Sequence, residues 1–135
     1  MTSNIFLEHL PPIHHHLGGH NIDWDTQKSE LTIHYQALDS FTNPHGTVEG
    51  GMLCAMLDDV MGLFAWIANA RKPATTINLT MDFLRPCHVG SVMTKCRFIK
   101  QGKTILSLES EAWQNQKMVA RSTANFLILK EPSLD

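Results

Sequence analysis

Two adjacent carboxylates stand in a strongly apolar part of the sequence. Asp58 and Asp59 are the only charged residues between Glu49 and Arg71. Burying an unpaired charge is costly and shifts the pKa of the group, so a carboxylate in such surroundings usually has a use. One of the two is therefore the best candidate for acid–base or nucleophilic chemistry. Because successive helical positions point in different directions, we expect one member of the pair to reach solvent.

The apolar run from Gly50 to Ala68 predicts the helix that carries this pair. It is apolar around most of its circumference, so we expect burial on nearly every side. The run is long enough to span a membrane, but two central aspartates would each cost about 2.5 to 3.5 kcal/mol on insertion scales. The N-terminus lacks the basic and apolar regions of a signal peptide. We therefore predict a cytoplasmic protein without a membrane partner.

Length, charge and cysteine content narrow the class of protein. The 135 residues suit a single domain over residues 1–135. A net charge of −2 gives no broad basic surface, so we expect no nucleic-acid partner. Three cysteines without a CxxC pair argue against a disulfide framework or a zinc knuckle and favour reduced, partly buried thiols. The His14–His16 run favours a surface turn or a helix end over a metal site, because nothing completes a ligand set.

After the helix, the hydrophobic period changes to two. Residues 75–84 alternate, with Ile77 and Leu79 on the apolar face and Thr76 on the polar face, which predicts a half-buried strand that ends before Pro86. Similar patterns predict strands at 20–24, 31–37, 91–100, 104–113 and 118–129, and a short lead-in helix at 4–11. This order predicts an α+β domain, in which one antiparallel sheet curls around one long central helix.

The central helix also bears on the oligomeric state. A single small sheet cannot cover a helix that is apolar on nearly every side, so we expect a second subunit to contribute to its burial. Most homo-oligomers are built on two-fold dimers. We therefore predict a homodimer or a dimer of dimers.

The segment that leads into this helix resembles a known family. Hotdog-fold thioesterases of the phenylacetate-degradation type carry the motif Asn-x-x-Gly-x-x-His-Gly-Gly, with an Asp nine residues after the His. The segment Phe83-Leu84-Arg85-Pro86, with Gly90, is similar to that family's strand ending. The likeness extends over residues 18–129 and implies a hotdog-fold acyl-CoA thioesterase, with CoA as part of the substrate and no separate cofactor. The motif positions that match are Asn43, Gly46, Gly50, Gly51 and Asp58.

The glycine pair at the start of the helix suits a thioester carbonyl. Backbone N–H groups and the positive end of the helix dipole meet there, and they favour developing negative charge. The resemblance implies that the Gly50 N–H is the main donor, helped by the Asn43 side chain, while Gly51 lets the substrate approach the backbone. Asp58 lies about 12 Å further along the same helix. The resemblance implies that Asp58 of the partner subunit completes the site.

Further roles follow for the remaining candidates. Asp58 would act as a general base or as a nucleophile. Thr76, where relatives carry a hydroxyl residue, would orient the attacking water or the carboxylate, or it is an ordinary residue of the polar strand face. Cations at the ends of elements are candidates for binding the CoA phosphates: Arg71, Lys72, Arg85, Lys100 and Lys103.

Glu49 is the departure from the family motif, because relatives usually carry His there. An ionised carboxylate cannot donate a hydrogen bond. Glu49 could be a favourable charge at the helix start, worth about 0.3 to 1 kcal/mol, or could lie near Asp58 of the partner subunit and raise its proton affinity. It is also a catalytic candidate, because it could activate water or substrate in a variant mechanism. Two other functions stay open: an acyl-CoA-binding protein without turnover, and a hotdog dehydratase that uses His45 and Glu49. The spacing to Asp58 fits hydrolysis better than dehydration.

Overall fold

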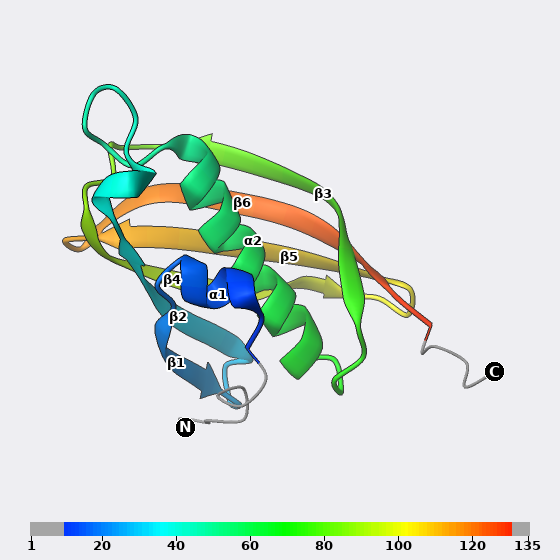
Figure 1. Cartoon of the computed structure of the whole chain (residues 1–135). Helices are drawn as coiled ribbons and strands as arrows, with labels where there is room; N and C mark the ends of the chain where they lie inside the picture. Colours follow the sequence, from blue (N-terminus) through cyan, green and yellow to red (C-terminus); the bar gives the residue numbers. More distant parts are fainter. Residues whose placement is uncertain (1–9, 131–135) are drawn as a thin grey trace.

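The computed structural model describes residues 10–130, in which one long helix lies across a single curved sheet (Figure 1). The predicted α+β hotdog architecture is confirmed. The helical elements are α1 (Pro12–His16), the short 3₁₀ helix η1 (Asp39–Phe41) and α2 (Gly50–Ile67). The strands are β1 (His20–Asp25), β2 (Glu30–Ala37), β3 (Ala74–Phe83), β4 (Gly90–Gln101), β5 (Ile105–Gln114) and β6 (Lys117–Ile128).

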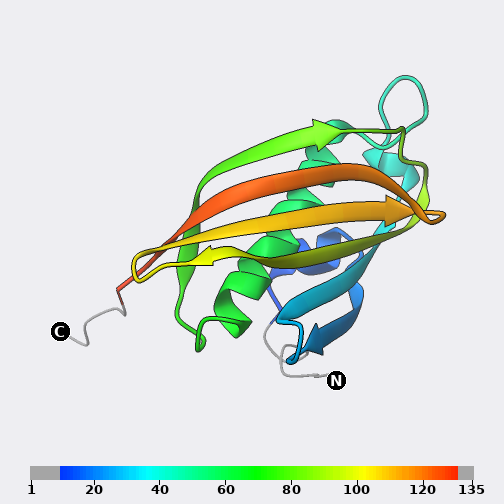
Figure 2. The ribbon, with the colours of Figure 1, turned by 180° about the vertical axis from the view of Figure 1, so that it is seen from behind.

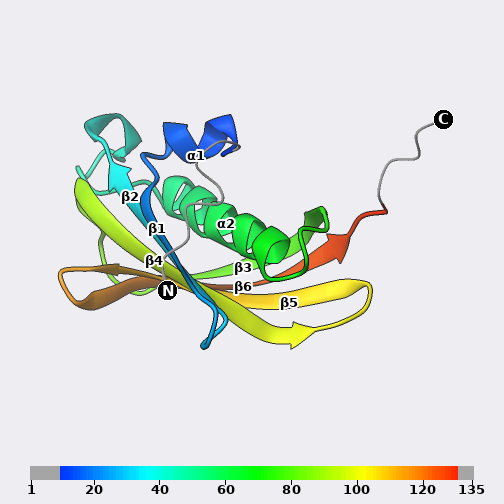
Figure 3. The ribbon, with the colours of Figure 1, turned by 90° about the horizontal axis from the view of Figure 1, so that it is seen from below.

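The sheet is antiparallel at every pairing and has the strand order β1-β2-β4-β5-β6-β3. The hairpins β4–β5 and β5–β6 join neighbours in the chain, as predicted. Strand β3 crosses to the far side and pairs with β6 alone, so it forms one edge of the sheet. Seen from behind, the sheet curves around α2 (Figure 2). Seen from below, α1 lies on the side of α2 that faces away from β5 and β6 (Figure 3).

Helix α2 buries one face against the sheet. Leu53, Leu57, Val60 and Phe64 recur every three or four positions and are buried, as the helical period requires. The prediction of burial on nearly every side is wrong for one chain, because only 39% of the helix is buried. One sheet covers one side, and α1 covers only part of the rest. By length and composition α2 also qualifies as a membrane span, a test that core helices pass as well, and here it packs across the sheet.

The core lies between α2 and the concave face of the sheet. Leu31, Ile33 and Tyr35 alternate along β2 and are fully buried, as are Leu106 and Leu108 on β5. Each such side chain contributes roughly 1.5 to 3 kcal/mol when it leaves water. The alternation predicted along residues 31–37 therefore agrees with the inward face of β2.

Strand β3 departs from its predicted alternation. Its pairing with β6 shifts register between Thr76 and Asn78, as in a β-bulge. Ile77 is consequently 50% exposed, and Thr76 faces α2. The assignment of Thr76 to the polar face and of Ile77 to the buried face is wrong, because one extra residue in a strand changes the face on which every earlier side chain lies.

The short helix α1 lies near the start of the described residues. Most of the predicted 4–11 segment lies outside the described residues, and α1 spans Pro12–His16, with proline at the first helical position. The predicted helix end at the histidine run is confirmed. However, His14 is fully buried, so the expectation of a surface position holds only for His15 and His16.

Candidate active site

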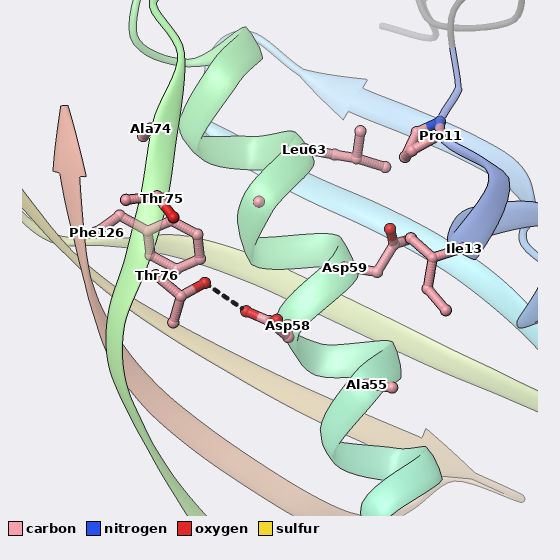
Figure 4. A pocket seen from close by; sticks show the side chains of 11 residues that line it. Pro11, Ile13, Ala55, Asp58, Asp59, Leu63, Ala74, Thr75, Thr76 and Phe126 are labelled. Atoms are coloured by element: carbon pink, nitrogen blue, oxygen red, sulfur yellow. Dashed lines mark hydrogen bonds between the residues drawn. The ribbon is translucent and has the colours of Figure 1, made fainter. Parts of the chain in front are cut away.

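Asp58 and Thr76 come together between α2 and β3. The Thr76 hydroxyl donates to Asp58 Oδ1 at 2.9 Å, as Figure 4 shows. The bulge in β3 makes this contact possible, because it turns Thr76 toward the helix. Asp58 is partly exposed, and within residues 10–130 its second carboxylate oxygen has no hydrogen-bond partner, so it can meet a ligand. The contact matches the predicted orienting function of Thr76, which stays a prediction as a catalytic role.

The Asp58 carboxylate opens into a groove of about 370 Å³. Small and apolar residues of α2 form its floor, including Ala55, Gly62 and Leu63, with β3 along one side and the α1 segment along the other (Figure 4). Phe126 of β6 also contributes to the lining. Polar and apolar atoms contribute about equally to the lining, and its polar side chains are Asp58, Asp59, Thr75 and Thr76. Such a groove suits a ligand with one reactive polar group and an apolar tail.

Asp59 has an entirely different environment. Its Oδ2 lies 2.7 Å from His14 Nδ1 and accepts from the Tyr35 hydroxyl at 2.7 Å. Burial raises the pKa of Tyr35 well above its usual value of 10.0, and the charge of Asp59 and its hydrogen bond raise it further, so the phenol stays a donor. The prediction that one aspartate of the pair reaches solvent is confirmed, and that residue is Asp58. Asp59 is the buried member.

Gly50 lies at the first turn of α2, in a second cavity of about 380 Å³. A Cβ atom on Gly50 would come within 3.1 Å of the Phe83 ring, so the close packing there favours glycine. The Gly50 N–H donates to Oε1 of Glu49 at 3.1 Å. The neighbouring Gly51 is exposed and has open space around its Cα. The Glu49 carboxylate thus accepts from the Gly50 N–H, the group that the family resemblance assigns as donor to the substrate carbonyl.

Asn43 organises the loop before α2. Its Nδ2 donates to Thr47 Oγ1 at 2.8 Å, and its Oδ1 accepts from the backbone N–H groups of His45 and Thr47. These contacts hold the loop that leads to Glu49. The predicted donation from Asn43 to the substrate stays a prediction, and it would require the amide to exchange its bond with Thr47.

Of the predicted phosphate-binding cations, Arg85 is the one that lines the Gly50 cavity. Its Nη1 also donates to the Met118 carbonyl at 2.8 Å. Lys100 and Lys103 are exposed near the β4–β5 turn, and the intervening Gln101 contacts the C-terminal end of α2, far from Gly50 in the same chain. The other two predicted cations, Arg71 and Lys72, lie just beyond that helix end and are exposed. The Arg71 guanidinium lies over the Trp66 ring.

The cysteine thiols are poor competitors of Asp58 as a nucleophile. Burial raises the pKa of Cys87 to about 11 and that of Cys96 well above its usual range. Cys54, on α2, has its pKa raised by burial and by the charge of Asp58. The reactive form of cysteine is the thiolate, which these shifts disfavour at neutral pH. Among residues 10–130, His, Cys, Asp and Glu side chains form no group of three or more that could hold a metal.

Comparison with known proteins places this geometry in a family. The sequence profile of the Thioesterase superfamily matches residues 45–121. The chain belongs to the thioesterase superfamily. A phenylacetic acid degradation-related protein of Ralstonia eutropha JMP134 shares 35% identity and a TM-score of 0.80, over 87% of this chain and 90% of that one.

Two further comparisons are informative. The acyl-CoA thioester hydrolase YciA of Salmonella typhimurium is 33% identical over 91 residues, which span 66% of this chain and 68% of that protein. The PaaI protein of the Escherichia coli phenylacetic acid degradation operon has a TM-score of 0.80 at 23% identity, over 93% and 89% of the two chains, and supports the fold.

The superfamily match covers only part of the site just described. Residues 45–121 include Gly50, Asp58 and Thr76. They exclude Asn43 and all of α1, so the contact between His14 and Asp59 joins the matched region to a segment outside it. The resemblance drew attention to the first three residues. His14 and Tyr35 were missed, because a lone His or Tyr carries no pattern that reveals a long-range partner.

Proposed function

We propose that the protein hydrolyses the thioester bond of an acyl-CoA, releasing a carboxylate and free CoA. The observation that carries the proposal is the Asp58 carboxylate, which accepts a hydrogen bond from Thr76 and faces a groove with both polar and apolar lining. Membership of the thioesterase superfamily and similarity to an acyl-CoA thioester hydrolase support the same reaction. We further propose that the enzyme acts in the cytoplasm, where unpaired thiols such as its free cysteines persist.

The chemistry needs groups from two subunits. The Gly50 cavity and the Asp58 groove share no lining residue, and eight helical positions separate these residues by about 12 Å. In a two-fold dimer, Asp58 of the partner subunit can face the Gly50 N–H. A dimer or a dimer of dimers is therefore part of the proposal.

The β3 edge is a suitable dimer contact. Unpaired backbone groups along an edge strand favour addition of another strand. Ile77, Phe83 and Leu84 are 50%, 54% and 43% exposed at this edge, which is unusual for large apolar side chains that have no further role. Pairing two copies through β3 would cover these side chains and bring the unburied face of α2 toward the partner.

In the proposed reaction, the thioester carbonyl oxygen accepts from the Gly50 N–H and takes the place of the Glu49 carboxylate. Asp58 removes a proton from water, which attacks the carbonyl carbon, or Asp58 attacks directly to form an anhydride that water then hydrolyses. The C–S bond breaks, and the thiolate leaves and is protonated to free CoA. Arg85, beside Gly50, is placed to meet an anionic part of CoA.

A binding protein without turnover is the second candidate. The observation that favours it is the bond from the Gly50 N–H to Glu49, because an anion at this donor competes with a developing oxyanion. Steady-state thiol release across a panel of acyl-CoAs separates the two functions. Turnover by the purified wild type supports hydrolysis, whereas binding without thiol release supports the alternative.

Subunit complementation tests the composite site directly. Gly50→Pro removes the N–H donor at a helix position that tolerates proline, and the extended Glu49 backbone (ψ 135°) suits a residue before proline. Gly50→Pro and Asp58→Asn should each be inactive alone. Refolded as a 1:1 mixture, they should recover about a quarter of the wild-type rate, because half of the dimers would contain one intact site.

The control is Gly50→Ala, which keeps the N–H and tests the contact with Phe83 alone. It should retain more activity than Gly50→Pro. No recovery of activity in mixed dimers, shown to form by native mass spectrometry, would rule out a site shared between subunits. A monomeric mass with full activity would do the same.

A further inference from the structure

Helix α1 is attached to α2 by one buried polar contact. The His14 side chain is 0% exposed, and its Nδ1 lies 2.7 Å from Asp59 Oδ2. An ionised carboxylate only accepts, so the imidazole donates through Nδ1–H. The His14 Nε2 atom is also buried and has no partner in the described structure. The bond to Asp59 is thus the polar contact that orients this histidine, whose ring also packs edge-on against Tyr35.

The surroundings leave this contact little freedom. Tyr35 donates to the same Asp59 oxygen at 2.7 Å and holds the carboxylate from the β2 side. On the other side, a Cβ atom on Gly19 would overlap the His14 imidazole, so the chain can turn there only with glycine. The Gly19 N–H donates to the His14 carbonyl at 3.0 Å, and the Gln36 N–H donates to the Gly18 carbonyl at 3.0 Å. The end of α1 is thus fixed to both α2 and β2.

This contact positions one side of the groove that holds Asp58. Pro11 and Ile13 line the groove opposite β3, and Ile13 immediately precedes the buried His14 (Figure 4). Ile13 is 48% exposed, so its own packing does little to hold it in place. Asp58 and Asp59 are neighbours on α2 and both line the groove, and Asp59 also holds the α1 side through His14.

We propose that His14 is a positioning residue that sets acyl selectivity, by holding Ile13 as the far side of the acyl-binding groove. This inference rests on the proposed thioesterase function. The substrates affected are acyl-CoAs whose apolar tail extends beyond the reacting carbonyl to Ile13. Acetyl-CoA carries the shortest acyl group of the series and therefore provides an internal reference.

A polar contact serves this purpose better than general burial. An apolar residue at position 14 would also fill buried space, but it would not define one orientation of α1 relative to Asp59. When the His14 donor is lost, Tyr35 still donates to Asp59. The position of α1 should therefore change, while the free energy of unfolding should change little. His14→Leu should therefore separate selectivity from stability.

The experiment measures kcat and KM for acetyl-, hexanoyl-, octanoyl- and phenylacetyl-CoA. For the longer acyl group that the wild type uses best, His14→Leu should lower kcat/KM relative to acetyl-CoA by about tenfold, mainly through KM. Ile13→Ala should change the same ratio. His14→Asn, whose amide nitrogen can replace Nδ1, should restore it. His16→Ala, at an exposed position of the same helix, is the matched control and should leave the ratio unchanged.

Each other outcome has a definite meaning. A lower melting temperature of His14→Leu with unchanged acyl ratios would make His14 a structural anchor only and overturn the inference. If the wild type hydrolyses acetyl-CoA but none of the acyl-CoAs with longer acyl groups, the inference is overturned as well, and the proposed function stays intact. A wild type without thiol release from any acyl-CoA would overturn the proposed function, and the selectivity role with it.

Discussion

Asp58 and Asp59 are neighbours in the sequence and opposites in the structure. Asp58 is partly exposed, has one hydroxyl partner and opens into a groove. Asp59 is buried, and its contacts with His14 and Tyr35 come from segments distant in the chain. The more exposed carboxylate, Asp58, is the one available for chemistry, whereas the buried Asp59 joins α2 to α1 and β2 through His14 and Tyr35. Burial of a charge in an apolar helix therefore indicates a structural role as readily as a catalytic one.

The largest effect is expected from Asp58→Asn. The amide cannot act as a base or as a carboxylate nucleophile, so kcat should fall by about 100- to 10,000-fold. Because Asp58 is partly exposed and Thr76 can still donate to the amide oxygen, the free energy of unfolding should stay within about 0.5 kcal/mol of wild type. Thiol release and urea denaturation measure the two effects.

Asp59→Asn should show the reverse pattern. Its Oδ2 position receives two donors, and an amide can satisfy them only with its oxygen turned toward both, while its NH₂ group is left in a buried site. We expect a loss of about 1 to 3 kcal/mol in unfolding free energy. The fall in kcat should be much smaller than for Asp58→Asn. If the two substitutions exchange rank in kcat, Asp58 is not the reactive carboxylate.

Thr76→Val removes the hydroxyl that orients Asp58 and keeps the shape and β-branching of the side chain. A hydrogen bond to a charged group contributes roughly 1.5 to 3 kcal/mol, so kcat should fall by about tenfold or more if the bond persists in the transition state. Thr76→Ser keeps the hydroxyl and should retain most of the activity. Equal kcat values for Thr76→Val and Thr76→Ser would show that the Thr76 hydroxyl has no part in the reaction and that the residue is an ordinary part of β3.

The smallest effect is expected at Glu49. Its carboxylate accepts from the Gly50 N–H, and a charged acceptor binds about twice as strongly as a neutral one. Glu49→Gln should weaken this competition and raise kcat/KM by a few fold, and Glu49→His should do likewise and shift the acidic limb of the pH profile. A sharp fall in kcat for both variants would instead mean that the carboxylate takes part in the reaction. Equal rates for all three proteins would leave Glu49 as a charge at the helix start.

The order and type of the main elements were predictable from the sequence. The predicted strand at 75–84 and the helix from Gly50 to Ala68 agree with β3 and α2 to within one residue. Such agreement is expected, because alternation and helical spacing are local properties that the chain displays without its partners. The same local pattern, with the family resemblance, was enough to select Gly50 and Asp58 as candidates.

Tertiary structure alone decided which side chains meet. The bulge after Thr76 depends on how β3 pairs with β6, and it reverses the face that alternation predicts. His14 and Asp59 are 45 residues apart, and only the docking of α1 onto α2 brings them together. Local periodicity determines whether a segment is a helix or a strand. Pairing register and element docking depend on contacts between distant segments, which no single stretch of the sequence records.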